Sequence, residues 1–183
     1  MKTLKLFFAA ALFCAAFSTH ASSVASRAPK FSSAYTDLKS QCKAIGESDM
    51  EGEDTPLRCE GFGGYEIRID FSAASSHLRL QTKGGGAEDS VELAQQPLDY
   101  DSKRKIEWRL ADGKPFAVIL RVDKPKDGLD PSEVWRPENK AGESLLVKGL
   151  KGHERIDFEV AANTPNANEK ARELADGAYA KGR

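Results

Sequence analysis

The sequence predicts a mainly β (α+β) protein, with an antiparallel sheet or partly closed barrel of about seven to eight strands and one C-terminal helix. Residues 106–122 form two apolar-rich runs joined by Asp112-Gly113. Asp-Gly is a strong hairpin signal because the turn requires positive φ angles, which glycine adopts without steric cost. Residues 65–72 alternate strictly between apolar and polar, as in a strand with one solvent-facing side. The C-terminal residues, by contrast, have helical spacing.

The N-terminal residues predict export. Lys2 and Lys5 precede twelve uncharged, mostly apolar residues at 6–17. This apolar core is typical of a secretory signal peptide and is shorter than the roughly 20 residues of a membrane-spanning helix. We assign residues 1–21 to the signal peptide, with cleavage after Ala25 as the second choice. The mature protein is therefore expected to be periplasmic or secreted, without stable membrane insertion.

The composition of the mature chain bounds its function. Cleavage leaves 162 residues with 25 basic and 28 acidic side chains, a net charge of −3. A nucleic-acid-binding protein would normally carry a basic domain or stripe. We therefore do not expect the mature chain to bind nucleic acid. Residues 22–34 are rich in Ser, Ala and Pro and predict a flexible leader. Residues 35–183 have the size of a single β-rich domain.

Two cysteines remain after cleavage, Cys42 and Cys59. In an oxidising compartment the pair predicts a disulfide, which would stabilise the fold by about 3 kcal/mol, and two buried thiols are the alternative. A zinc site needs four ligands, and the mature chain adds only His77 and His153 without tight spacing. We expect neither a metal nor a cofactor.

The first part of the mature chain predicts strands and turns. Residues 35–45 predict a strand that carries Cys42. The acidic residues at 47–54 predict a solvated loop, because their spacing does not match a calcium-binding loop. Residues 61–64 (GFGG) predict a hairpin turn before the alternating strand. Phe62 at its tip is either a recognition contact or a core residue.

The middle of the chain is less uniform. Residues 77–83 alternate as a strand does, whereas residues 91–93 predict either a short helix or an edge strand, ended by Pro97. The basic residues at 103–105 predict a solvated entry to the central hairpin. In that hairpin, Glu107 and Arg109 are expected on the solvent-facing side, in an ion-pair ladder that Arg121 joins.

The second strand of the hairpin is predicted to be central because both of its faces are apolar. One face is expected to hold Phe116, Val118, Leu120 and Val122. Residues 123–143 then form a long loop with three prolines and Trp135, typical of a functional or disordered segment, and Trp135 favours a packed one. A second hairpin follows at 144–160.

The C-terminal helix is predicted from about residue 165. Thr164-Pro165 gives a cap and a first-turn proline, and Asn166 and Asn168 are alternative caps. Because the apolar stripe of the helix is narrow, we expect it to dock on the sheet edge.

Two pairs of stretches resemble an uncharacterised family of small exported proteobacterial proteins. They are residues 106–109 (IEWR) with 115–121 (PFAVILR), and 166–169 (NANE) with 171–176 (ARELAD). The resemblance covers most of the mature chain and implies no activity. Members of the family have a further cysteine at the position of the Gly152-His153 turn, with a partner near the C-terminus. Both are absent here, so the helix is held less firmly.

A looser similarity is to periplasmic lysozyme inhibitors, which are small exported antiparallel β proteins that present loops to an enzyme cleft. Thr82-Lys83-Gly84 resembles one of their loop motifs. Residues 61–65 do not match the Ser-Gly-containing partner loop, so the similarity implies only a mode of binding.

These observations favour binding over catalysis. An enzyme needs a nucleophile with a base, a carboxylate pair or a metal, and no motif surrounds His77 or His153, so no catalytic residue is assigned. We expect a non-catalytic binding or inhibitor-like module of the bacterial envelope that recognises a protein partner through loops at one end of its sheet. A structural or envelope-stress protein is the alternative, followed by a hydrolytic enzyme. The residues of the binding hypothesis are Phe62, Tyr65, Thr82, Lys83 and Trp135.

Overall fold

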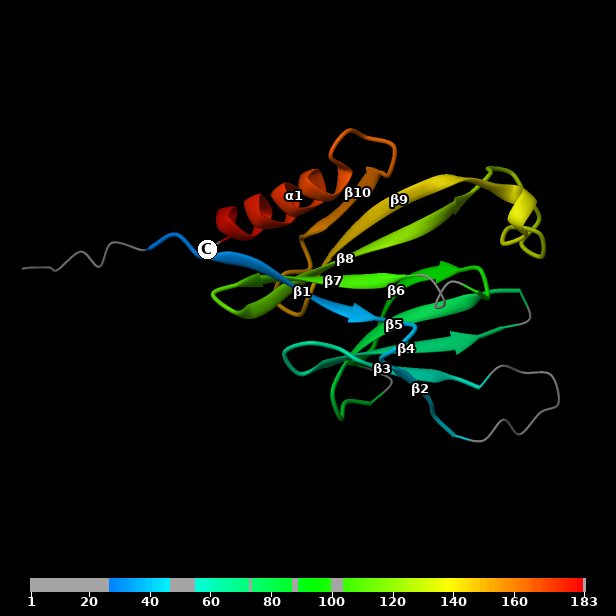
Figure 1. Ribbon diagram of the computed structural model, residues 1–183, viewed down its shortest axis with the longest axis horizontal. Helices are drawn as coiled ribbons and strands as arrows, with labels where there is room; N and C mark the ends of the chain where they lie inside the picture. Colours follow the sequence, from blue (N-terminus) through cyan, green and yellow to red (C-terminus); the bar gives the residue numbers. More distant parts are fainter. Residues whose placement is uncertain (1–26, 47–54, 73, 87–88, 100–103, 183) are drawn as a thin grey trace, which may run out of the picture.

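A computed structural model describes residues 27–46, 55–72, 74–86, 89–99 and 104–182 (Figure 1). The predicted signal peptide with its cleavage site and the acidic loop 47–54 lie outside these residues. The mainly β fold with one C-terminal α-helix is confirmed. The described strands number ten and form two antiparallel five-stranded sheets rather than a closed barrel.

Sheet A has the strand order β1-β7-β8-β9-β10, and sheet B has the order β2-β3-β4-β5-β6. The strands of sheet A are β1 (Phe31–Asp37), β7 (Lys105–Ala111), β8 (Lys114–Pro125), β9 (Lys140–Gly149) and β10 (Asp157–Ala161). Those of sheet B are β2 (Cys42–Ala44), β3 (Leu57–Glu60), β4 (Tyr65–Phe71), β5 (Ser76–Thr82) and β6 (Val91–Gln96). Of the alternatives for residues 91–93, the edge strand is confirmed.

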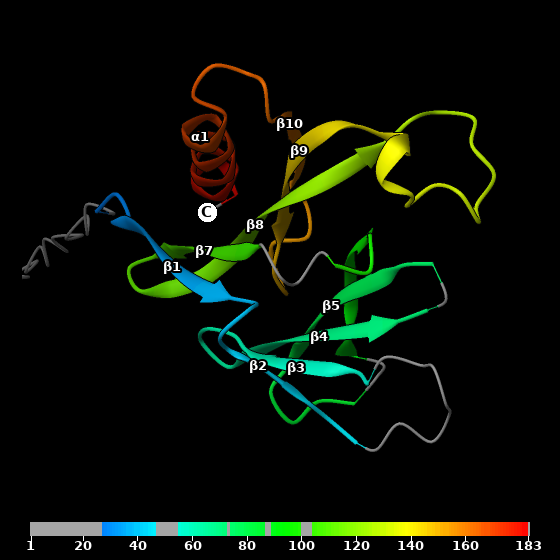
Figure 2. The ribbon, with the colours of Figure 1, turned by 45° about the vertical axis from the view of Figure 1, so that its right-hand side comes forward.

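The molecule has three layers, with sheet A between sheet B and helix α1 (Ala167–Lys181) (Figure 2). One core fills the space between the sheets and the other lies between sheet A and α1. The central strand β8 contributes to both cores, which explains why both of its faces are apolar. The inter-sheet core includes Ile67, Ile69, Leu78, Ile106, Trp108, Val118 and Leu120, and the helix-side core includes Phe116, Ile119, Val147, Ile156, Ala171 and Ala175.

The N-terminal part differs from the prediction in two ways. Strand β1 begins at Phe31, so the leader predicted over 22–34 extends four residues too far. The single strand predicted over 35–45 is two strands in different sheets. The chain turns after Asp37 because its carboxylate accepts hydrogen bonds from the backbone N–H groups of Lys39 (3.0 Å) and Ser40 (3.2 Å). Leu38 is buried at this corner.

The central hairpin has the predicted turn, with φ of 49° at Asp112 and 80° at Gly113. Its register shifts by one residue, because Arg109 pairs with Ala117 whereas Leu110 pairs with Pro115. Phe116 is the extra residue of this bulge. It therefore packs in the helix-side core, and its prediction on the same face as Val118 is wrong.

Helix α1 lies across the face of sheet A, with contacts to β7, β8, β9 and β10, and the prediction of edge docking is wrong. Ala167, Ala171 and Ala175 are all buried against the sheet. Their small side chains allow the helix backbone to approach closely, so a narrow stripe is enough to cover a face. The helix begins after Asn166, one of the predicted alternative caps, which has a φ of 56° and makes no side-chain capping bond.

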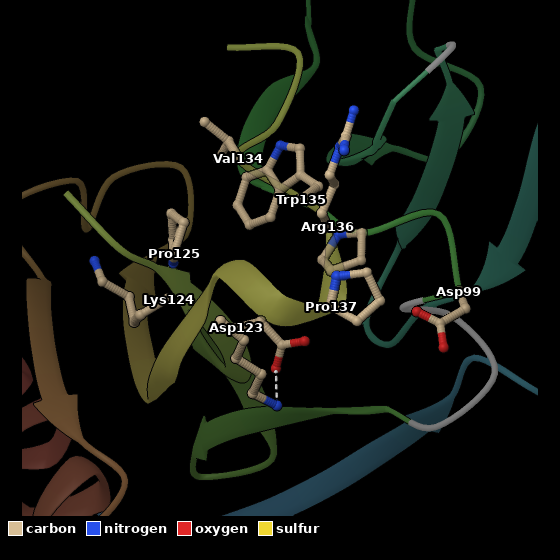
Figure 3. Close-up of a pocket in the computed structure, with 10 residues that line it drawn as sticks. Asp99, Asp123, Lys124, Pro125, Val134, Trp135, Arg136 and Pro137 are labelled. Carbon is tan, nitrogen blue, oxygen red and sulfur yellow. Dashed lines mark ion pairs between the residues drawn. The ribbon is translucent and has the colours of Figure 1, made fainter. Parts of the chain in front are cut away.

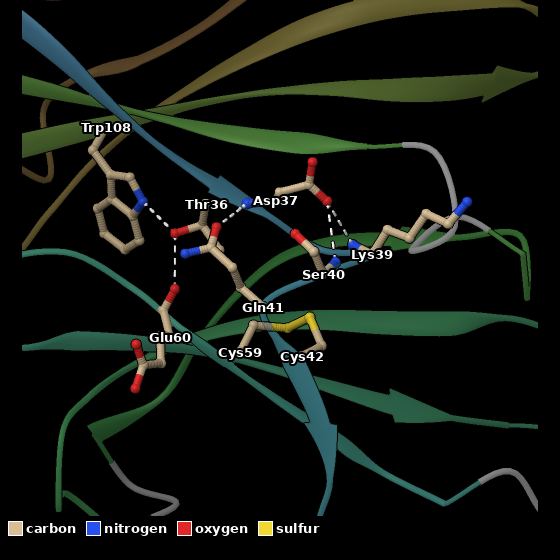
Figure 4. The surroundings of a disulfide bond; sticks show 9 residues. All are labelled: Thr36, Asp37, Lys39, Ser40, Gln41, Cys42, Cys59, Glu60 and Trp108. Atoms are coloured by element: carbon tan, nitrogen blue, oxygen red, sulfur yellow. Dashed lines mark hydrogen bonds between the residues drawn. A yellow bond between two sulfur atoms is a disulfide. The ribbon is translucent and has the colours of Figure 1, made fainter.

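Cys42 and Cys59 are joined by a disulfide, as predicted, and lie opposite each other on β2 and β3 (Figure 4). A polar chain beside it joins the two sheets. The Trp108 indole N–H donates to Thr36 Oγ1 at 2.9 Å, and Thr36 Oγ1 donates to the Glu60 carbonyl at 2.9 Å. The disulfide therefore fixes two neighbouring strands of sheet B, and the hydrogen bonds through Thr36 connect that sheet to sheet A where the chain crosses from β1 to β2.

Candidate functional site

The five residues of the binding hypothesis do not form one site. Tyr65 and Thr82 pair across β4 and β5, and the Lys83 N–H donates to the Gly64 carbonyl at 2.8 Å, beside the turn that carries Phe62. Trp135 lies in the β8–β9 loop, at the opposite end of the molecule (Figure 1). The prediction of loops gathered at one end is therefore wrong, because successive hairpin turns alternate between the two ends of an antiparallel sheet.

The turn that carries Phe62 is packed on the central hairpin. A Cβ atom at Gly63 would lie 2.5 Å from the Pro115 ring, so the turn depends on glycine at this close approach. Phe62 is 37% exposed and belongs to neither core, whereas Tyr65 packs against Trp108 with ring centroids 6.1 Å apart. Phe62 is thus an accessible residue on a fixed turn, and Tyr65 belongs largely to the core.

Trp135 borders a hollow of about 190 Å³, which we call the Trp135 groove (Figure 3). Three prolines from separate segments and a valine give the groove its apolar walls, and charged side chains from β8, β9, the β8–β9 loop and the segment after β6 surround it. The apolar residues are Pro97, Pro125, Val134, Trp135 and Pro137, and the charged ones are Asp99, Asp123, Lys124, Arg136 and Lys140.

Hydrogen bonds hold the loop that carries Trp135. The Lys126 N–H donates to the Asn139 carbonyl at 2.8 Å and closes the base of the loop. Asn139 Nδ2 donates to the Glu133 carbonyl at 2.9 Å across its middle. The Ser132 N–H donates to Asp130 Oδ1 at 2.9 Å in a local turn. These bonds order the loop around Trp135, but the bounds predicted for it, 123–143, are wrong, because β8 continues to Pro125 and β9 begins at Lys140.

A group of five charged side chains lies under the groove, and we call it the floor cluster: Arg104, Arg121, Asp123, Lys140 and Glu143. Arg104 Nη2 lies 2.6 Å from Asp123 Oδ1 and 3.2 Å from Glu143 Oε1. Lys140 Nζ lies 2.9 Å from Asp123 Oδ1 and 2.8 Å from Glu143 Oε1, and Arg121 Nη1 lies 3.2 Å from Glu143 Oε2.

Glu143 and Lys140 of the floor cluster stay ionised over a wide pH range. Lys140, followed by Arg104 and Arg121, lowers the pKa of Glu143 to about 2. Glu143 and Asp123 in turn raise the pKa of Lys140. Arg104 has a side chain only 14% exposed, so the prediction that residues 103–105 are a solvated run is wrong for Arg104. No sequence signal indicated the cluster, because its members come from segments far apart in the chain.

Glu107 and Arg109 are buried beneath α1, at 8% and 5% exposure, so the prediction of a solvent-facing ladder is wrong. Arg109 donates to both carboxylate oxygens of Asp176, at 3.1 and 2.6 Å. Arg172 donates to both oxygens of Glu107, at 2.7 and 3.1 Å. Charged side chains of the helix, rather than water, therefore form the hydrogen bonds of Glu107 and Arg109. The four-residue spacing of Arg172 and Asp176 places both on one helix face. This spacing was the one feature of the sequence that could have indicated ion pairs between the helix and β7.

Ser75, His77 and Glu92 are arranged in space like the serine, histidine and acid of a hydrolase triad, with the imidazole in the middle. The sequence did not indicate this arrangement. His77 Nε2 lies 3.5 Å from Ser75 Oγ, and His77 Nδ1 lies 3.5 Å from Glu92 Oε1. Ser75 is only 1% exposed, however, and its Oγ accepts a 2.7 Å hydrogen bond from Gln95 Nε2. A nucleophile must reach its substrate, so this arrangement does not support catalysis as it stands.

His153 lies apart from that group, against the rings of Phe116 and Tyr179. Burial lowers its pKa. Within the described ranges, no group of three or more His, Cys, Asp or Glu side chains is placed to hold a metal ion. The same part of the chain contains no helix long and apolar enough to cross a membrane.

No protein-family model, curated protein or solved structure matches this chain. The resemblances to the exported family and to lysozyme inhibitors therefore stay predictions. The structure does bring together two of the stretches that carry the first resemblance, since residues 107 and 109 contact residues 172 and 176. These ion pairs give the two stretches a role in holding the helix on the sheet, so the stretches do not by themselves indicate a functional site.

Proposed function

We propose that this protein is an exported, non-catalytic binding module whose Trp135 groove receives part of a partner protein. The observation that carries the proposal is an indole held by an ordered loop over a proline-lined hollow, directly above the floor cluster. Tryptophan and arginine are enriched among the residues that contribute most to protein interfaces, often about 2 kcal/mol or more each. The groove combines both residue types with an apolar wall.

The size of the groove favours a protein partner. Pockets for drug-sized ligands usually have volumes of about 300 to 1,000 Å³. A hollow of about 190 Å³ accommodates one or two side chains of a larger partner instead. Walls of aromatic and proline side chains also suit an extended segment, which lies along such a surface without secondary structure of its own.

The rigidity of the site supports binding without rearrangement. The loop is closed by its own hydrogen bonds, and the floor cluster fixes the ends of β8 and β9 by five ion pairs. Association is less costly when the contacting residues are already ordered. The disulfide between Cys42 and Cys59 suits an oxidising compartment, in agreement with the predicted export.

The proposal is tested with the mature protein immobilised and exposed to a periplasmic extract, followed by quantitative mass spectrometry of the retained proteins. Trp135→Ala should reduce retention of a specific protein about thirtyfold, since 2 kcal/mol corresponds to that factor. Phe62→Ala is the matched control, because it removes an exposed aromatic ring at the opposite end and should leave retention unchanged.

Both variants should melt at nearly the temperature of the unmodified protein. Retention of every protein to the same extent by Trp135→Ala and the unmodified chain would contradict the proposal. A loss of the same partner in Phe62→Ala alone would place the site at the other end. Turnover of a cell-wall substrate that depends on His77 would instead favour the enzyme alternative.

A further inference from the structure

A second hollow lies where the sandwich is open. On the side opposite the β1–β2 corner, strand β6 is the edge of sheet B, and the β9–β10 hairpin borders sheet A. The hollow between them has a volume of about 380 Å³ and is lined by β5, β6, the end of β9, the turn at 150–156 and the start of β10. We call it the edge cleft.

The floor of the edge cleft is apolar. Leu80, Leu93, Leu150 and Ile156 line it, and each is at most 6% exposed, so they are the margin of the packed core. Val91, on the free edge beside them, is 62% exposed. An apolar β-branched side chain at such an edge is unfavourable in water, and covering it would be favourable.

The backbone of β6 offers a template for a further strand. Within the described residues, β6 pairs with β5 on one side and with no strand on the other. At the C-terminal end of β6, the side chain of Gln96 bonds to the backbone of β8: it accepts from the Asp123 N–H at 2.7 Å and donates to the Asp123 carbonyl at 3.4 Å. The N-terminal half of β6, which carries Val91, is therefore the part of the edge proposed to accept a strand.

The rim of the edge cleft is acidic. It carries four acidic and two basic side chains: Asp89, Glu92, Glu154, Asp157, Lys148 and Lys151. Lys148 is paired with Asp157 at 2.7 Å. The Gly152 N–H donates to Glu154 Oε1 at 2.7 Å, which keeps that carboxylate ionised. Glu92 already lies 3.5 Å from His77 and 3.8 Å from Arg79, so the negative charge that basic side chains of a partner would meet comes mainly from Asp89 and Glu154.

We propose that β6 accepts an extended segment of a partner protein as a sixth strand of sheet B. The segment alternates apolar and basic side chains. Its apolar side chains enter the edge cleft over Leu80, Leu93 and Ile156, and its basic ones lie on the acidic rim. Main-chain hydrogen bonds to the β6 edge supply affinity, and the alternation supplies specificity. This surface shares no residue with the Trp135 groove.

The test uses defined peptides and the full mature protein. The probe is a capped octapeptide of alternating valine and lysine. One control peptide replaces lysine by glutamate, and a second keeps the side chains but carries N-methyl groups on alternate residues, which removes backbone donors. Binding is measured by titration calorimetry and by hydrogen exchange of the β6 amides.

The Val-Lys peptide should bind and slow exchange in β6 at least tenfold. The Val-Glu peptide should bind at least tenfold more weakly, and the N-methylated peptide should not protect β6. Val91→Lys should weaken binding about tenfold while leaving the protein folded. Asn168→Lys, at an exposed position of α1, makes the same change in net charge and should bind the peptide normally.

Absence of binding by the Val-Lys peptide would overturn the proposal. So would equal binding of the N-methylated peptide, or protection confined to other strands. Trp135→Ala should bind the peptide normally, so that failure of the Trp135 groove and failure of the edge cleft are distinguished.

Discussion

The outer face of sheet A and the outer face of sheet B have similar sequences and different surroundings. Both come from strands with alternating charged residues, Glu107 and Arg109 in one and Arg68 and Asp70 in the other. On sheet A the side chains are 10% and 6% exposed, because α1 covers them. On sheet B, where no described helix lies over the face, they are 41% and 25% exposed (Figure 2). Alternation thus predicts a strand but does not reveal what covers its polar side.

The difference in burial changes what an ion pair contributes. Removal of one partner from a buried pair leaves a charge without compensation and typically costs about 3 to 5 kcal/mol. An exposed pair contributes about 0 to 1 kcal/mol, because water already solvates both groups. The floor cluster lies between these two cases. Three substitutions therefore test the comparison in order of expected effect.

The largest effect is expected for Asp176→Ala. This change leaves Arg109, which is 5% exposed, without its bidentate carboxylate. We expect a loss of about 3 kcal/mol in the free energy of unfolding, measured by urea denaturation. The double variant Arg109→Met with Asp176→Leu should recover much of this loss. A loss below about 1 kcal/mol for Asp176→Ala would show that water reaches Arg109.

An intermediate effect is expected from the protonation of Glu143. Its pKa in the folded protein is about 2, below its ordinary value of 4.5, so its contribution is fully present above about pH 5. That contribution is lost as the pH falls toward 2. We expect Glu143 to account for about 1 to 2 kcal/mol of the acid loss of stability, allowing for solvent screening.

The measurement is urea denaturation at intervals from pH 6 to pH 2. Glu143→Gln should be less stable at pH 6 and should lose less stability on acidification than the unmodified protein. Parallel curves for the two proteins would contradict the assigned pKa.

The smallest effect is expected for Asp70→Ala on the open face of sheet B. Asp70 lies 2.6 Å from Arg68 and 3.6 Å from Arg79, and all three side chains are partly exposed. The free energy of unfolding should change by less than about 1 kcal/mol. A loss comparable to that of Asp176→Ala would mean that a partner covers this face in solution, and the loss would then depend on protein concentration.

The central hairpin was predictable because all of its signals are local. Asp112-Gly113 specifies the turn, and the apolar faces of β8 specify a central strand. The division into two sheets was not predictable, because it depends on pairing between distant segments: β1 pairs with β7, whereas β2 pairs with β3. The position of Phe116 depends on a one-residue bulge that changes the register without changing composition.

Only the half-buried Trp135 of the candidate site could be predicted from the sequence. Trp135 in a proline-rich loop indicated a packed loop. The residues beneath it, such as Arg104 and Glu143, are brought together by the pairing of β8 with β9 and by the entry to β7. Charge in a sequence does not specify its partner when the two are 39 positions apart. The separation of Trp135 from Phe62 likewise follows from strand direction, which the single-residue signals do not contain.

The pairing of β1 with β7 has a consequence for folding. The two strands adjoin in sheet A, yet all five strands of sheet B lie between them in the sequence. Sheet B is therefore an insertion whose neighbouring strands are also neighbours along the chain, and such local pairings form faster than distant ones. If the chain is exported from its N-terminus, as predicted, Cys42 and Cys59 would meet before β7 arrives. The disulfide would then form in sheet B, while β1 would pair only later, once β7 is available.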